Sequence, residues 1–224
     1  THTSSYKKPL LSLVCILALS CVVEASSVTN SASSLNLGTN SSQFKVIQRT
    51  QKDGKTYDQN QGVENYPTDL AWTVNDHGST IDYVYIALAY QNNPKLSKVY
   101  VQFDQPSTIQ TLQIDTKKYD NAQKDIWTYI NRGNGNNVTI NNLKIMGDTK
   151  TVIEPQANKN YSITTIEHSG LNLDLKTKNN STLTITTFNQ NSGTTEISSN
   201  SIKIENFKLN AGSVNNNGGT ITTL

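Results

Sequence analysis

The chain has little of the material from which a compact enzyme core is built. Apolar residues make up 34% of its 224 residues and aromatic residues 7%, and charged residues are also sparse at 16%. So lean a supply of apolar side chains favours an elongated shape over a compact core. The net charge of +2 is small, and the lysines are scattered rather than gathered on one stripe. We therefore expect no nucleic-acid partner.

Cysteine is almost absent as well. The only two cysteines, Cys15 and Cys21, both lie in an apolar run near the N-terminus. Removal of that run would leave a chain without a thiol, which excludes disulfides and thiolate metal ligands. This composition suits an exported protein that has to stay unfolded during transit.

Residues 1–25 have the pattern of a secretory signal peptide. A basic patch precedes an apolar stretch over 10–23, which is shorter than the roughly 20 residues of a membrane-spanning helix. Small residues follow, and they predict cleavage between Ala25 and Ser26. Two alternatives stay open, namely a retained membrane anchor and lipid attachment at Cys21.

What the chain does contain is Asn, Ser and Thr, placed between short apolar segments with a period of two. These segments are 138–140, 143–145, 171–175, 183–185, 202–204 and 221–224. Such a period is typical of a strand with one buried face. No segment buries a core alone, but stacked coils close their apolar faces against their neighbours. The pattern predicts an all-β protein in which 133–224 form the first coils of a parallel β-solenoid that continues beyond this chain.

The segments are irregularly spaced, so a β-sandwich of short strands is the alternative fold. Upstream, residues 26–43 are dense in Ser and Asn and are predicted to be a flexible polar lead. Residues 44–132 carry most of the aromatic side chains and several alternating apolar runs. We expect a β-rich N-terminal cap there, because a solenoid has to cover its first edge.

Two short clusters contain the residue types of a catalytic triad. Asp76, His77 and Ser79 form the first, and residues 167–170, Glu-His-Ser-Gly, form the second. A triad needs its members held in fixed geometry, usually from distant segments. We interpret both clusters as polar turns and assign no catalytic residue.

The sequence also predicts no metal and no cofactor. Asp115, Asp120 and Asp125 recur every five residues, which matches neither a strand face nor a helix face, so we expect them to be solvated. A polysaccharide-cleaving solenoid needs carboxylates that converge on one face. The acids of the predicted coils do not recur with the spacing of the segments; they are Asp148, Glu154, Glu167, Asp174, Glu196 and Glu205.

The leader Tyr6-Lys-Lys-Pro-Leu-Leu-Ser-Leu-Val14, joined to an Asn/Ser/Thr-rich series of apolar segments, resembles the vacuolating cytotoxin and cytotoxin-like autotransporters of bacteria. The resemblance implies a signal peptide, a right-handed parallel β-helix as passenger, and a C-terminal barrel in the outer membrane beyond Leu224. It does not extend to pore formation, since no Gly-x-x-x-Gly motif lies in an apolar run here.

Taken together, these features lead us to expect a bacterial protein that is exported and then displayed on the cell surface or released. Its expected role is attachment or host interaction, with a host surface protein or glycan as partner. We expect no enzymatic activity in this chain. A β-helix enzyme with its site outside this segment and a pore-forming cytotoxin are the alternatives.

Overall fold

The computed structural model describes residues 31–38, 44–61, 69–74, 80–92, 94–103, 105–130 and 135–224. The predicted cleavage point at Ala25 and Ser26 lies outside these residues, as does the cluster of Asp76, His77 and Ser79.

The described chain consists of one short 3-10 helix and sixteen strands. They are η1 (Ala32–Ser34), β1 (Phe44–Lys52), β2 (Lys55–Gln61), β3 (Asp69–Val74), β4 (Thr80–Tyr90), β5 (Lys98–Phe103), β6 (Ser107–Lys118), β7 (Trp127–Ile130), β8 (Val138–Gly147), β9 (Lys150–Ile153), β10 (Asn160–Ser169), β11 (Asn172–Leu175), β12 (Thr182–Gln190), β13 (Thr194–Ile197), β14 (Ile202–Leu209), β15 (Ser213–Asn216) and β16 (Thr220–Thr223). This part of the chain contains no helix with the length and hydrophobicity of a transmembrane span.

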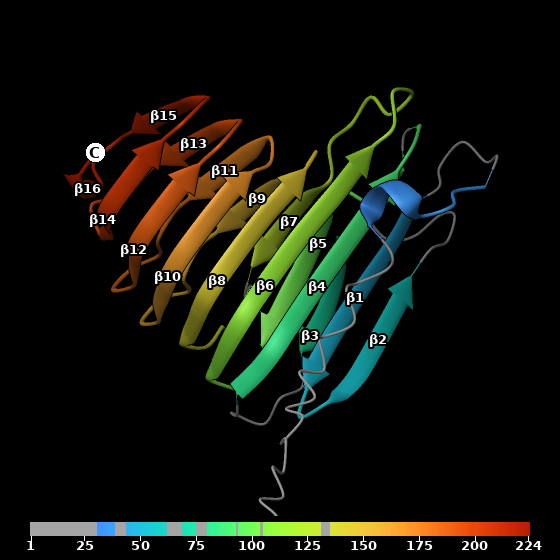
Figure 1. The fold of residues 1–224 in the computed structure, drawn as a ribbon, viewed down its shortest axis with the longest axis horizontal. Helices are drawn as coiled ribbons and strands as arrows, with labels where there is room; N and C mark the ends of the chain where they lie inside the picture. The colour runs from blue at the N-terminus through green and yellow to red at the C-terminus, as the bar shows by residue number, and fades with distance from the viewer. Residues whose placement is uncertain are drawn as a thin grey trace, which may run out of the picture.

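The strands alternate between two sheets. Sheet A has nine strands in the order β16-β14-β12-β10-β8-β6-β4-β1-β2, and sheet B has seven in the order β15-β13-β11-β9-β7-β5-β3. From β3 and β4 onward, each strand pairs in parallel with the strands one coil before and after it. Figure 1 shows sheet A in front of sheet B, with the coils stacked toward the C-terminus. This topology confirms the predicted parallel β-solenoid and does not match the alternative sandwich.

The N-terminal end of sheet A is closed by an antiparallel hairpin. β1 pairs with β2 and also with β4 in antiparallel fashion. The change to parallel pairing occurs at β4, so the first coils already lie within residues 44–132, the range in which we expected the cap. Aromatic and apolar residues of this range therefore form both the hairpin and the first coils.

Each long strand of sheet A bends midway. In β8, Ile140 is buried, Asn141 and Asn142 point outward in succession, and Leu143 is buried again. Strict alternation would place Asn142 inside, so the two consecutive outward residues mark a corner. The same break recurs in β10, β12 and β14. A coil therefore has three faces, two from sheet A and one from sheet B.

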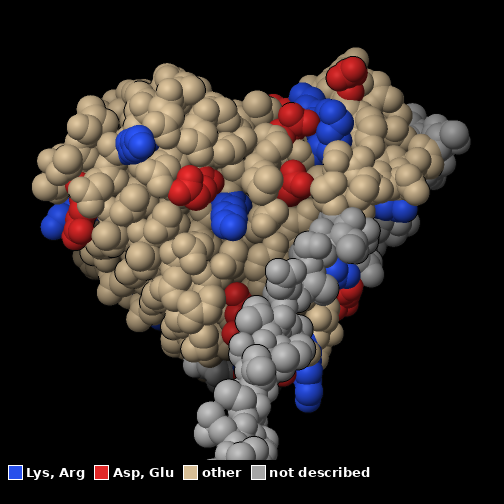
Figure 2. All heavy atoms as spheres, in the orientation of Figure 1, with Lys and Arg blue, Asp and Glu red and all other residues tan. Residues whose placement is uncertain are grey.

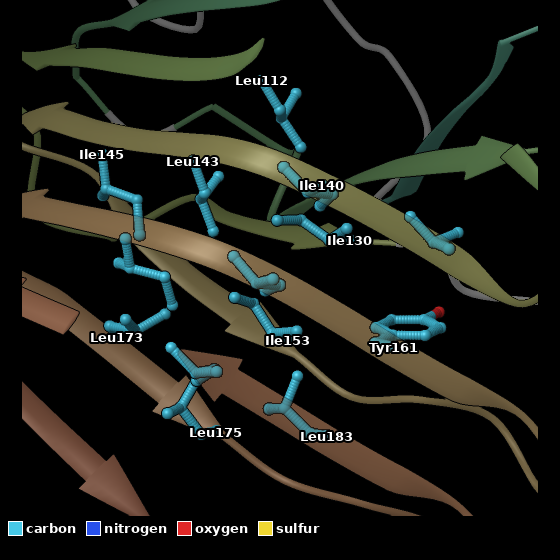
Figure 3. Close-up of a cluster of buried hydrophobic side chains, with 14 of the residues drawn as sticks. Leu112, Ile130, Ile140, Leu143, Ile145, Ile153, Tyr161, Leu173, Leu175 and Leu183 are labelled. Carbon is cyan, nitrogen blue, oxygen red and sulfur yellow. The ribbon is translucent and has the colours of Figure 1, made fainter. Parts of the chain in front are cut away.

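The core is a set of apolar rows that run along the stack. One row consists of isoleucines in register, namely Ile81, Ile109, Ile140, Ile163, Ile185, Ile204 and Ile221. Figure 3 shows this interior, with side chains of both sheets meeting between them. Burial of each such side chain stabilises the fold by about 1.5–3 kcal/mol. Successive isoleucines are 28, 31, 23, 22, 19 and 17 residues apart, which explains why the repeat looks irregular in the sequence.

The first described residues pack across the outside of sheet A. Ala32 and Leu35 are buried against Tyr85 and Ala87 of β4, and the Ala32 backbone N–H donates to Asp115 Oδ2 at 3.2 Å. These residues belong to the stretch 26–43, which the sequence predicts to be a flexible lead. Apolar contacts and one hydrogen bond hold residues 31–38 in place instead.

Candidate binding surfaces

The Glu-His-Ser-Gly cluster lies at the end of a strand, so its interpretation as a turn is wrong. Glu167, His168 and Ser169 belong to β10, whose alternation points His168 inward and its neighbours outward. The ring is fully buried, with Nε2 donating to the carbonyl of Thr194 at 3.0 Å and Nδ1 accepting from the Gly170 N–H at 3.3 Å. Burial lowers the pKa of His168. A neutral, enclosed imidazole between two backbone groups is a core residue rather than a catalytic base.

Two of the three regularly spaced aspartates are not simply solvated. Asp115 accepts the Ala32 N–H, and Asp125 accepts hydrogen bonds from Lys118 and Lys150, both at 2.7 Å. Burial alone would raise the pKa of Asp125, but the bonds from the two ammonium groups lower it. The expectation that the aspartates are solvated was wrong for Asp125, because β6 and β9 bring Lys118 and Lys150 to it from different coils.

One pair of acids does recur with the coil period, contrary to the sequence-based expectation. Asp174 and Glu196 are register partners on the outer face of sheet B. Burial raises the pKa of Asp174, and Glu196 Oε1 accepts from Nδ2 of Asn215 at 3.2 Å and of Asn217 at 3.3 Å. Within the described ranges, no three His, Cys, Asp or Glu side chains are grouped to hold a metal ion. The pair therefore offers two carboxylates on this face but no metal site.

Among the recesses that the described residues form, two lie on the lateral faces of the coils. The first is an open groove of about 340 Å³ across the beginnings of β6, β8 and β10. It is lined by uncharged residues, namely Pro106, Ser107, Thr108, Asn137, Val138, Thr139, Asn160 and Ser162. Thr108, Thr139 and Ser162 are outward-facing register partners, so they form one hydroxyl row. Figure 2 shows that the visible face of the coils is mostly uncharged, with isolated acidic and basic residues.

The second recess, which we call the sheet-B hollow, has a volume of about 180 Å³. Four residues of strands β5 and β7 and three residues that follow β9 and β11 line it: Lys98, Tyr100, Tyr129, Ile130, Glu154, Gln156 and Lys178. Parallel pairing stacks β5, β7, β9 and β11 side by side. It therefore joins side chains that lie up to eighty positions apart in the chain.

Aromatic and cationic groups meet in the sheet-B hollow. The Tyr100 and Tyr129 ring centroids lie 5.2 Å apart, with the ring planes tilted by 56°. Lys98 Nζ lies 5.5 Å from the centroid of the Tyr129 ring, which is cation–π distance. On the opposite side, Lys178 Nζ lies 3.9 Å from Glu154 Oε1.

A second lysine–aromatic pair lies beside the hollow and differs in one respect. Lys150 Nζ sits 5.6 Å from the centroid of the Trp127 ring and also pairs with Asp125 at 2.7 Å. Lys98 makes no ion pair with any residue that the structure describes. Of the two lysines, only Lys150 has a carboxylate partner among the described residues, and it shares that partner, Asp125, with Lys118.

Sequence reasoning missed both recesses. The crowding of aromatic side chains between 44 and 132 is the one signal in the sequence, and it predicts a cap rather than a recess. Register was the missing information, because coils of unequal length bring together positions with no common spacing.

No family model matches the chain, and comparison with curated proteins and with solved structures yields no similar protein.

Proposed function

We propose that the chain is the passenger of an exported, autotransporter-type bacterial protein, displayed or released, and that it mediates attachment to host-surface molecules. The observation that carries the proposal is the presence of two recesses on the lateral faces of a rigid parallel stack. Both are lined by side chains suited to hydrogen bonding, and one also offers aromatic rings.

The periodicity of the solenoid supports an extended contact. Parallel neighbours lie about 4.8 Å apart, so each outward row repeats the same hydrogen-bonding group at that spacing. A polymeric partner such as a glycan chain meets several rungs at once, and weak contacts that act together give high avidity. The signal-peptide pattern of residues 1–25 supports export, and the resemblance of the leader supports the autotransporter route.

Cell binding of the full chain tests this proposal. We expect saturable binding of labelled protein to cultured host cells, and a loss of most of that binding after the cells are treated with glycosidases and proteases. The control is Ile163→Asp, which places a charge in the isoleucine row and abolishes the ordered surface. Non-saturable binding, or equal binding by this variant, would refute attachment. Release of a dye from lipid vesicles, or of reducing ends from polysaccharides, would instead support the cytotoxin or the enzyme.

A further inference from the structure

We propose that the sheet-B hollow is a binding site for a carboxylated sugar residue, such as a uronic or sialic acid at the end of a glycan. This inference rests on the proposed attachment function and names the ligand class of one of its sites. It follows from the charges, the aromatic rings and the size of the hollow.

The cationic groups supply the first argument. Lys98 has an aromatic face beside it and no carboxylate partner within the described part of the chain. The Lys178–Glu154 separation of 3.9 Å exceeds the 2.7–2.9 Å of a charge-assisted hydrogen bond, so the Lys178 ammonium still has donors to offer. Two lysines and one glutamate leave an excess of positive charge. An anionic ligand is therefore favoured over a neutral one.

The rings supply the second argument. Tyr129 is only partly buried, and its ring stands in the hollow between Lys98 and Tyr100. Because Lys98 Nζ lies over the Tyr129 ring, the ring positions the ammonium group in the hollow, and the exposed part of the ring adds apolar contact for the C–H groups of a sugar. Gln156 donates through Nε2 to the Glu154 carbonyl at 3.3 Å, which leaves its side-chain oxygen to accept a sugar hydroxyl.

Size supplies the third argument. A volume of about 180 Å³ is below the roughly 300–1,000 Å³ of pockets for drug-sized ligands. One ring with its substituents fits such a space, whereas a folded peptide segment does not. The larger, uncharged groove on sheet A lacks any lysine, so the two recesses differ in the ligand charge that they favour.

Titration calorimetry of the full chain with three oligosaccharides tests the inference. The probes are 3′-sialyllactose, trigalacturonate and, as the neutral counterpart of the first, lactose. We expect at least one acidic probe to bind, lactose not to bind, and added salt to weaken binding. The pair of acidic probes distinguishes a sialic acid from a uronic acid.

Two charge-matched variants assign the binding to the hollow. Lys98→Gln should weaken acidic-probe binding by about tenfold or more, since a hydrogen bond to a charged group is lost. Lys144→Gln removes one positive charge from an exposed position of β8 and should leave the affinity unchanged. Circular dichroism and melting temperature confirm that both variants fold.

Several results would overturn the inference: equal affinity for lactose, no effect of Lys98→Gln, an equal effect of Lys144→Gln, or tighter binding of an oligoglutamate peptide than of both acidic sugars. Cell binding by Lys98→Gln separates this inference from the proposed function. Attachment that persists unchanged in the variant shows that cells are not bound through the hollow, which overturns the inference and leaves the attachment function standing. Wild-type protein that binds no cells refutes the attachment function, whatever the calorimetry shows.

Discussion

His168 occupies a position where every other coil places an apolar or amide side chain. Its register partners in the inward row are Ile145 on one side and Gln190 on the other. Gln190 is also buried and donates through Nε2 to the carbonyls of Gly193 and Ser213. Both side chains therefore hydrogen-bond to backbone carbonyls at the passage from sheet A to sheet B, which satisfies their own buried polar atoms.

We predict that the fold loses stability in mild acid through His168. Its pKa is lowered from 6.5 by burial, so the folded protein binds the proton less readily than the unfolded chain. The free energy of unfolding therefore has its full value above pH 6.5, where His168 is neutral in both states. It declines as the pH falls toward the pKa of the folded state, by up to about 1.4 kcal/mol per pH unit.

Urea unfolding between pH 7.5 and 5 measures this loss in the wild type and in His168→Gln. The glutamine matches its neighbour Gln190 and carries no titratable group, so the pH dependence of the variant should be flatter. The other two histidines, His2 and His77, remain in both proteins. Parallel pH profiles for the two proteins would show that another group controls the acid response.

At the scale of elements, glycines mark the corner between the two sheets. Gly147, Gly193 and Gly212 all have positive φ and lie close to the preceding coil. A Cβ atom on Gly193 would lie 2.2 Å from the carbonyl oxygen of Gly170. The coils therefore stack closely at this corner only because the side chain is absent.

We predict that Gly193→Ala destabilises the protein by about 3 kcal/mol or more, the sum of left-handed strain and displaced backbone. Gly54→Ala is the matched control, because Gly54 has the same φ of +72° and nothing within 4 Å of its Cβ position. That variant should lose only about 1–2 kcal/mol. Equal losses in urea unfolding would show that close stacking at the corner contributes nothing.

Most of the strands could be predicted from the sequence, because their apolar residues alternate on either side of each bend. Runs with a clean period of two, such as 183–185 and 202–204, lie in strands of the structure. β10 was overlooked because Tyr161 and His168 occupy inward positions that hold aliphatic residues in recognised segments such as 138–140 and 143–145. The sheet-B hollow could not be predicted, since Lys98 and Lys178 become neighbours only through the register of several unequal coils.

At the scale of the whole molecule, the stack narrows toward its C-terminal end. The spacing between successive isoleucines falls from 31 to 17 residues, because the later coils have shorter connections. Both recesses span several coils, since their lining runs from β5 and β6 to β10 and to Lys178, which follows β11. Most of the lining residues belong to strands, so we expect ligand contact on the faces of these coils rather than on their loops.

All of these conclusions depend on coils that are stacked in register, and paired spin labels measure that register directly. Thr139 and Ser162 are outward-facing partners on adjacent coils, and Thr184 continues the row one coil further. Two double-cysteine variants are made, one at Thr139 and Ser162 and one at Thr139 and Thr184, in a chain where Cys15 and Cys21 are changed to serine. The two introduced cysteines of each variant are labelled with a nitroxide.

The parallel stack predicts backbone separations of about 4.8 Å for the adjacent pair and about 9.6 Å for Thr139 with Thr184. Strong dipolar broadening in the electron paramagnetic resonance spectrum of the first pair, and weaker broadening in the second, is the expected result. Spectra of the adjacent pair without broadening, equal to the sum of its single-label spectra, would contradict the β-solenoid.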